Sequence, residues 1–230
     1  MEISPQNISF YELLARTYIL KKDFLEAENV LNKAIKIDQD NVAAILLLGE
    51  LSQNLGKQAE AVSLYKQAIE KNPAKIEPYL RLSAIYEEQK KYDAAIKMYE
   101  EVLKLDSKNI FASNNLAYIY LQNDQNLDRA LDLAQNAMEF ASENPMVMDT
   151  LGLVYYKKGL YPKAIRLFEQ CIEKIKNDPR LFYHLGLAYR ENGQKEKAKE
   201  ALNKAISFNS DFPEKDLTRK ALNDIGSSAK

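Results

Sequence analysis

The chain has 230 residues, of which 46% are hydrophobic and 28% are charged, a composition that excludes an intrinsically disordered protein. Its 32 basic and 33 acidic residues leave a formal net charge of −1, so there is no general attraction to phosphate backbones and we expect no nucleic-acid partner. No apolar stretch approaches the roughly 20 residues that span a bilayer, and we expect no direct membrane insertion.

A repeat with a period of about 34 residues runs along most of the sequence. Six copies begin at Ile8, Val42, Ile76, Ile110, Pro145 and Pro179. In chain order we expect a lead-in of residues 1–7, repeats at 8–41, 42–75, 76–109, 110–144, 145–178 and 179–212, a further helix at 213–225 and a tail at 226–230. Positions within a repeat are called places, and each is counted from the first residue of that repeat.

Two columns of small residues predict how each repeat folds. Place eight holds Ala15, Gly49, Ser83, Ala117, Gly152 and Gly186. Place twenty holds Ala27, Ala61, Ala95, Ala130, Ala164 and Ala198. Small residues let two helix backbones approach each other, so each repeat is predicted to be a pair of antiparallel helices.

The residues between repeats support the same register. Good N-cap residues precede five of the six first helices: Asn7, Asn41, Asn109, Asn144 and Asp178. Only Lys75 breaks this pattern. The fourth repeat has one extra residue, which we place in the turn between its helices at residues 123–127.

The two ends of the predicted stack differ. The helix at 213–225 has Leu217, Ala221, Leu222 and Ile225 on one side and charged residues on the other, which is typical of a helix that caps a stack. The first helix, by contrast, is apolar around much of its circumference. Such a helix needs cover, and two alternatives stay open: further repeats before it, or self-association through this N-terminal edge.

Two stretches identify the repeat. The sequence LGLVYY begins at Leu151 and is followed by Ala164 and Phe168, and the next repeat has LGLAY from Leu185. This pattern resembles the tetratricopeptide repeat. The resemblance implies an all-α fold: a right-handed α-solenoid of six helical hairpins plus a C-terminal capping helix, in one continuous superhelical domain. It also implies a scaffold or adaptor that binds a protein or peptide partner.

In this family the first helices line a concave groove, which places two, five, nine, twelve and thirteen face. The resemblance therefore implies a peptide-binding groove formed by Glu50, Glu77, Glu87, Phe111, Asn114, Tyr118, Met146, Asp149, Leu153, Tyr156, Arg180, Tyr183 and Arg190. These residues run from acidic, through aromatic and amide, to basic, an order that would orient a charged ligand. The alternative is that Tyr118, Leu153 and Tyr156 only pack between helices.

The sequence offers no residues for catalysis, and we do not expect an enzyme. Its one histidine, His184, has no second His or Cys near it in the sequence to make a metal site, and no nucleotide-binding, nucleophile-elbow or zinc-protease motif is present. The single cysteine, Cys171, stands where other repeats have Ala or Val, so it is interpreted as a small packing residue. No cofactor is expected.

Residues 110–215 also resemble the last repeats of bacterial arrays that are linked to exopolysaccharide and envelope-protein export. The hypothesis of first choice is nevertheless a non-catalytic adaptor that binds a peptide or helical segment in its groove. The alternatives are a self-assembling structural array and the C-terminal part of a longer export protein. One reduced cysteine and the absence of a signal-peptide pattern favour the cytoplasm, with the periplasm left open for a part of an exported protein.

Overall fold

The computed structural model describes residues 8–123, 126–208 and 211–227, and over these residues the chain forms thirteen helices and no strand. This confirms the predicted all-α helical-repeat fold. The lead-in, including the expected N-cap Asn7, lies outside the described residues, as do Asp124 and Gln125 of the predicted inner turn.

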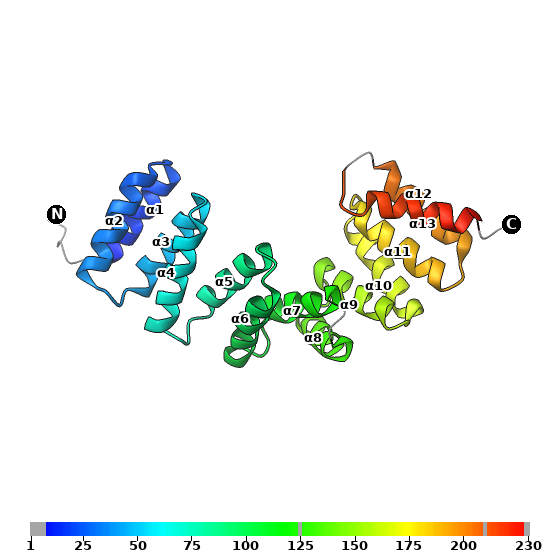
Figure 1. Ribbon diagram of the computed structural model, residues 1–230, viewed down its shortest axis with the longest axis horizontal. Helices are drawn as coiled ribbons and strands as arrows, with labels where there is room; N and C mark the ends of the chain where they lie inside the picture. The colour runs from blue at the N-terminus through cyan, green and yellow to red at the C-terminus, as the bar shows by residue number, and fades with distance from the viewer. Residues whose placement is uncertain (1–7, 124–125, 209–210, 228–230) are drawn as a thin grey trace. The chain divides into compact units, whose positions relative to one another are not determined.

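The chain divides into two compact units, and the boundary falls between Ser107 and Lys108. Figure 1 shows each unit as successive helical hairpins. The first unit contains α1 (Ile8–Leu20), α2 (Phe24–Ile37), α3 (Val42–Asn54), α4 (Gln58–Lys71), α5 (Ile76–Glu88) and α6 (Tyr92–Leu105). The second contains α7 (Ile110–Gln122), α8 (Leu127–Phe140), α9 (Pro145–Lys157), α10 (Tyr161–Lys174), α11 (Pro179–Glu191), α12 (Lys195–Ser207) and α13 (Lys215–Ser227). The single superhelical domain stays a prediction.

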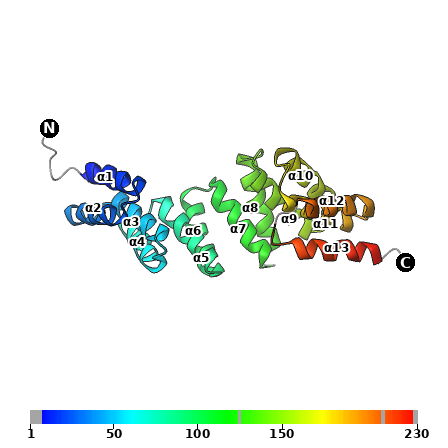
Figure 2. The same ribbon diagram turned by 90° about the horizontal axis from the view of Figure 1, so that it is seen from above.

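The second unit has two layers of helices. Helix α7 contacts α9, α9 contacts α11, and α11 contacts α13, so the first helices of successive repeats form one row. The second helices α10 and α12 lie on one side of this row (Figure 2). The row of first helices is where a groove was predicted.

Within a hairpin, the small residue at place eight receives a large side chain from the second helix. A Cβ atom added to Gly152 would lie 2.6 Å from Cε1 of Phe168, which is fully buried. The same construction at Gly49 meets Tyr65 at 2.7 Å, and at Gly186 it meets Leu202 at 2.6 Å. The small-residue column therefore exists because a bulky core residue packs directly against the first helix.

Helix starts follow the predicted caps. Asn41 Oδ1 accepts a hydrogen bond from the Ala44 amide at 2.9 Å, and Asn109, Asn144 and Asp178 cap their helices in the same way. Lys75 makes no side-chain cap, as expected. Each of these caps satisfies a backbone N–H that the first turn of a helix leaves unpaired.

The turns inside the hairpins use the left-handed region of backbone conformation. The residue there is glycine in the second, fifth and sixth repeats, and Gly159, for example, has φ of 72°. Lys22 and Lys90 hold the same place with φ of 61° and 57°. Glycine adopts this conformation without steric cost, so the lysine turns are the strained versions of the same connection.

The capping helix corrects one prediction. It begins at Lys215 and not at residue 213, and Leu217, expected on the packed side, is exposed. Thr218 is fully buried in its place, and its hydroxyl donates to the Glu214 carbonyl at 2.8 Å. The packed stripe of α13 is Thr218, Ala221, Leu222 and Ile225, which has the spacing of one helix face.

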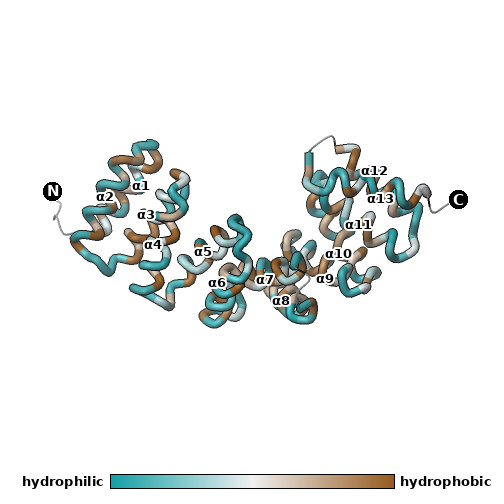
Figure 3. Tube along the Cα trace, in the orientation of Figure 1, coloured by the Kyte–Doolittle hydropathy of each residue, from teal (hydrophilic) through white to brown (hydrophobic). Residues whose placement is uncertain are grey.

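Hydrophobic and hydrophilic residues alternate along the helices (Figure 3). Helix α3 is buried around most of its circumference, with every residue from Ala44 to Gly49 buried. Helix α1, as predicted, leaves large apolar side chains exposed. Leu20 is 84% exposed, and Leu13 of α1 and Leu25 of α2 are exposed as well.

The glycine packing gives a stability test. Gly152→Ala should lower the free energy of unfolding by about 1–2 kcal/mol, because the clash with buried Phe168 outweighs the better helix propensity of alanine. Urea unfolding followed by circular dichroism measures this loss. Gly226→Ala on α13 is the matched control, since nothing lies within 4 Å of its added Cβ. Equal stability of the two variants would contradict the close-packing account.

Candidate functional site

An exposed apolar strip runs along the row of first helices in the second unit. Phe111 of α7 is 68% exposed and Met146 of α9 is 62% exposed, although both are large hydrophobic residues. Both occupy place two of their repeats, and Arg180 holds the same place on α11. Exposed side chains of this kind in adjacent repeats indicate a contact surface and not a core.

The other apolar and aromatic residues of the predicted groove in this unit are only partly exposed to solvent. Tyr118 is 40% exposed, whereas Leu153, Tyr156 and Tyr183 are partly buried and pack against the hydrophobic core. The Tyr156 ring also lies 5.8 Å from that of Tyr161. The packing alternative therefore holds in part for Leu153 and Tyr156, while Tyr118 presents a free surface.

The tyrosine hydroxyls titrate above their usual range. Burial raises the pKa of Tyr118, and the Asp149 and Glu214 carboxylates raise it further, whereas a hydrogen bond with Gln122 lowers it. Burial also raises the pKa of Tyr183, again with help from Glu214. Both side chains therefore stay neutral hydrogen-bonding groups at physiological pH.

Asp149, predicted as a groove residue, is engaged by the lone histidine. His184 Nδ1 lies 2.8 Å from Asp149 Oδ1, and both side chains are largely buried. The histidine ring also lies 5.6 Å from the Phe168 ring, centroid to centroid. This pair connects α9 to α11. Nothing in the sequence indicates this pairing, because the two residues lie in different repeats.

The two arginines of the last repeat also have partners. Arg180 binds Asp178 through two contacts, Nε to Oδ1 at 3.2 Å and Nη2 to Oδ2 at 2.7 Å. Arg190 Nη2 lies 2.8 Å from Glu191 Oε1. The basic end of the predicted groove is thus neutralised locally, which weakens its pull on an acidic ligand.

Two side-chain acceptor atoms of the second unit are buried without a hydrogen-bond partner. Asn114 of α7 is 6% exposed, and its Nδ2 donates to Asn115 Oδ1 at 3.3 Å. Glu214, just before α13, was missed in the sequence because it follows the last repeat and has no place in the period. Its Oε2 atom is buried without a hydrogen-bond partner, and the same is true of Asn114 Oδ1.

The acidic part of the predicted groove belongs to the first unit. Arg81 of α5 lies 3.4 Å from a carboxylate oxygen of Glu50 and 3.7 Å from one of Glu77. Glu87 accepts a hydrogen bond from the Tyr99 hydroxyl of α6. Sequence reasoning missed Arg81 as the cation that pairs with two of these carboxylates.

Metal-ligand groups and membrane-spanning helices were sought in the described ranges. No three His, Cys, Asp or Glu side chains there are placed to hold a metal ion. None of the helices described has the length and apolar character of a membrane-spanning segment.

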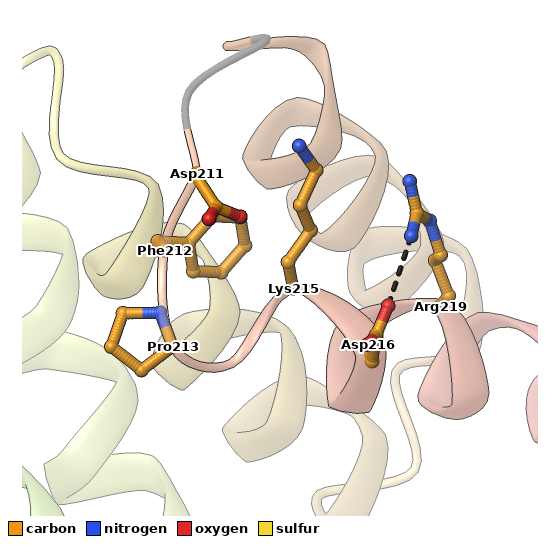
Figure 4. A pocket seen from close by; sticks show the side chains of 6 residues that line it. All are labelled: Asp211, Phe212, Pro213, Lys215, Asp216 and Arg219. Carbon is orange, nitrogen blue, oxygen red and sulfur yellow. Dashed lines mark hydrogen bonds and ion pairs between the residues drawn. The ribbon is translucent and has the colours of Figure 1, made fainter.

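A surface hollow beside residues 211–219 is polar, and its Arg219 is paired with Asp216 at 2.9 Å (Figure 4). Cys171 is fully buried, as predicted, and burial raises its thiol pKa to about 12.

Comparison with known proteins places the chain in a family. Profiles described as "Tetratricopeptide repeat" match residues 18–84, 76–109 and 179–212, and one described as "TPR repeat" matches residues 152–193. The chain belongs to the tetratricopeptide repeat family.

Two curated relatives that match the chain are longer than it is. The human mitochondrial import receptor subunit TOM70 is 23% identical over 205 residues, which cover 86% of this chain and 34% of that protein. The STIP1 homolog of Dictyostelium discoideum is 28% identical and covers 69% of this chain and 28% of its own length. The chain therefore spans about a third of these relatives.

Solved structures show the same fold. YrrB, described as a TPR protein with an unusual peptide-binding site, superposes with a TM-score of 0.71 at 22% identity, covering 83% of this chain and 96% of its own. Pseudomonas aeruginosa PilF superposes with a TM-score of 0.74 at 16% identity, covering 96% and 97% respectively. At these identities the likeness establishes the helical-repeat fold alone.

The environment of Glu87 makes a pH-dependent prediction. Burial raises the pKa of its carboxyl, which the Tyr99 hydrogen bond partly offsets. A raised folded-state pKa stabilises the fold fully below the unfolded pKa, near 4.5, and this contribution is lost as pH rises through the folded pKa. Glu87→Gln, which keeps an acceptor for Tyr99, should therefore raise the free energy of unfolding at pH 7 by a few tenths to about 1 kcal/mol.

Urea unfolding at pH 7 and pH 4 tests this prediction. The gain should shrink at pH 4, where the wild-type carboxyl is more often protonated. Glu100→Gln changes an exposed carboxylate on the neighbouring helix α6 and should give no gain. A loss of stability in Glu87→Gln at pH 7 would show that the charged hydrogen bond outweighs the burial.

Proposed function

We propose that the chain is a non-catalytic adaptor, and that the row of first helices in the second unit binds an extended or helical segment of a protein partner. The observation that carries this proposal is the exposed strip of Phe111 and Met146 with Tyr118 beside it. Large apolar and aromatic residues in neighbouring pockets supply most of the binding energy in protein interfaces. We call this surface the α7–α11 groove.

The proposal rests on apolar anchoring more than on the predicted charge gradient. Asp149, Arg180 and Arg190 each have an intramolecular partner, and so do Glu50, Glu77 and Glu87 of the first unit. A ligand that paired with these groups would have to displace existing contacts. The predicted orientation by charged ends therefore receives little support from the local geometry.

The relatives support a protein or peptide as the partner. TOM70 is named as a receptor subunit for mitochondrial import, and YrrB is described by its peptide-binding site. The chain covers only 34% of TOM70 and 28% of the STIP1 homolog, so the partners of these proteins are not assigned to this chain. Export of exopolysaccharide or envelope proteins, and a cytoplasmic location, stay predictions.

The strip provides a direct mutational test. A peptide selected by phage display on the full chain should lose about tenfold or more in affinity when Phe111→Ser and Met146→Ser are combined, because both anchors are removed. Fluorescence anisotropy measures the affinity, and the melting temperature should stay nearly unchanged because both side chains are exposed.

The control is a double variant on the outer side of the same unit. Phe140→Ser with Ile175→Ser removes two exposed apolar side chains from outside the row of first helices and should leave the affinity unchanged. Equal affinity of both double variants and wild type would contradict the groove assignment.

A second candidate function is supported by a different surface. Leu13, Leu20 and Leu25 are exposed at the α1 end of the first unit, where self-association was predicted. If this surface joins two copies of the chain, Leu13→Glu with Leu20→Glu should convert a dimer to a monomer in multi-angle light scattering, because charges are placed in an apolar contact. A wild-type monomer at tens of micromolar would contradict self-association.

A further inference from the structure

Two hollows of similar size lie on the second unit. The first, of about 690 Å³, is lined by residues from α8 to α10, and the second, of about 710 Å³, by residues of α11 and α12. Each includes the residues at places four, seven and eleven of one first helix, which are Met148, Leu151 and Tyr155 in the first hollow and Phe182, Leu185 and Tyr189 in the second. We call them the outer hollows.

The outer hollows and the α7–α11 groove use different faces of the first helices. The groove was assigned to places two, five, nine, twelve and thirteen, and its exposed anchors Phe111 and Met146 both hold place two. With 3.6 residues per turn, places four, seven and eleven fall on the other side of the same helix. A ligand in the outer hollows therefore contacts a surface that the proposed groove does not use.

The same contact between a lysine and a tyrosine recurs in both hollows. Lys163 Nζ lies 5.3 Å from the centre of the Tyr155 ring, and Lys197 Nζ lies 5.4 Å from that of Tyr189. Both lysines hold place nineteen of their repeats, and both tyrosines hold place eleven. An ammonium group has three N–H donors, and a ring face does not occupy them all. Each hollow thus holds a positive charge whose donors remain for a ligand.

These cations have no carboxylate partner within the chain. Over the ranges that the structure describes, no ion pair joins Lys163, Arg166 or Lys197 to an acidic side chain, although all three line the hollows. Lys174, which also lines the first hollow, is by contrast paired with Glu143. An acidic group of a ligand can therefore bind to the three free cations without displacing an existing pair, unlike in the α7–α11 groove.

The other residues of the hollows indicate which kind of acidic ligand fits. Met148 and Leu151 give the first hollow an apolar floor, and Leu185 does the same in the second. Glu173 lines the first hollow and Glu200 the second, and both repel a phosphate backbone, which carries a charge on every nucleotide. A peptide, in contrast, can place carboxylates at the cations and apolar side chains over the floor.

We propose that the outer hollows form a second binding surface, which takes an acidic segment of a protein partner. Carboxylates of this segment pair with Lys163, Arg166 and Lys197, and its apolar side chains lie over the floor. The surface goes beyond the proposed function, because it needs neither Phe111 nor Met146. It also assigns the two kinds of contact to different faces: apolar anchoring on the α7–α11 groove, and recognition of acidic groups on the outer hollows.

Peptide pools test this surface on the full chain. Three pools of twelve-residue peptides carry glutamate, glutamine or lysine at four fixed positions and uncharged residues elsewhere. By fluorescence anisotropy at low salt, wild type should bind the glutamate pool about fivefold more tightly than the glutamine pool, and the lysine pool most weakly, because several exposed ion pairs add up. Raising the salt concentration to about 0.5 M should reduce this preference, since salt screens exposed charges.

A double variant locates the preference. Lys163→Gln with Lys197→Gln should bring the glutamate and glutamine pools close to equal affinity, and the melting temperature should stay nearly unchanged because both side chains are exposed. The matched control is Lys33→Gln with Lys66→Gln, which removes the same charge from exposed positions on the second helices α2 and α4. The control should keep the preference for glutamate.

The outcomes separate this surface from the α7–α11 groove. A glutamate preference that is lost in the Lys163 and Lys197 variant but kept in Phe111→Ser with Met146→Ser supports the outer surface. The proposal is overturned if the preference survives in the lysine variant, if it is lost in the Phe111 and Met146 variant, if the control loses it equally, or if no pool binds.

Two further measurements test the choice of ligand. A single-stranded oligonucleotide that binds more tightly than the glutamate pool, and does so through Lys163 and Lys197, would assign the hollows to nucleic acid and contradict the proposal. A wild-type dimer in light scattering that the lysine variant dissociates would assign them to a second copy of the chain, which also contradicts it.

Discussion

The close approach of the two helices within each hairpin is the constraint on which the rest of the structure depends. At Gly152 there is no room for even one additional carbon atom, because the Phe168 ring already lies against the first helix. Since the same contact recurs at Gly49 with Tyr65 and at Gly186 with Leu202, the hairpins share one internal geometry. Repeated units of one geometry stack side by side, and stacking buries hydrophobic clusters between successive helices.

That geometry also decides which side chains remain for binding. The second helices contribute large residues to the core, and the first helices bury most of their surface against neighbouring helices. The remaining exposed positions of α7 and α9 carry Phe111 and Met146, which are not part of this core. The charged residues Asp149, Arg180 and Arg190 are engaged in local pairs, so the exposed surface offers mainly apolar contact.

The sequence predicted the fold well because its signals are local and periodic. Asn41 and Asp178 begin helices where their caps indicated, and the small-residue column marks the hairpin crossings. The candidate site was predicted less completely, because pairing depends on contacts between repeats. Arg81 of α5 pairs with Glu50 of α3, which belongs to the preceding repeat. Glu214 follows the last repeat, so the repeat pattern assigns it no position. Leu217 was wrongly expected on the packed side of α13, where Thr218 packs instead.

Site-specific photo-crosslinking tests the central claim, that the inner row of the second unit is the binding surface. A benzoylphenylalanine residue replaces either Phe111 on α7 or Phe140 on α8, two exposed phenylalanines of the same repeat. With a peptide selected on the full chain, the account predicts a crosslinked adduct from position 111 and none from position 140. Adducts from position 140 alone would place the ligand on the outer helices and contradict the account.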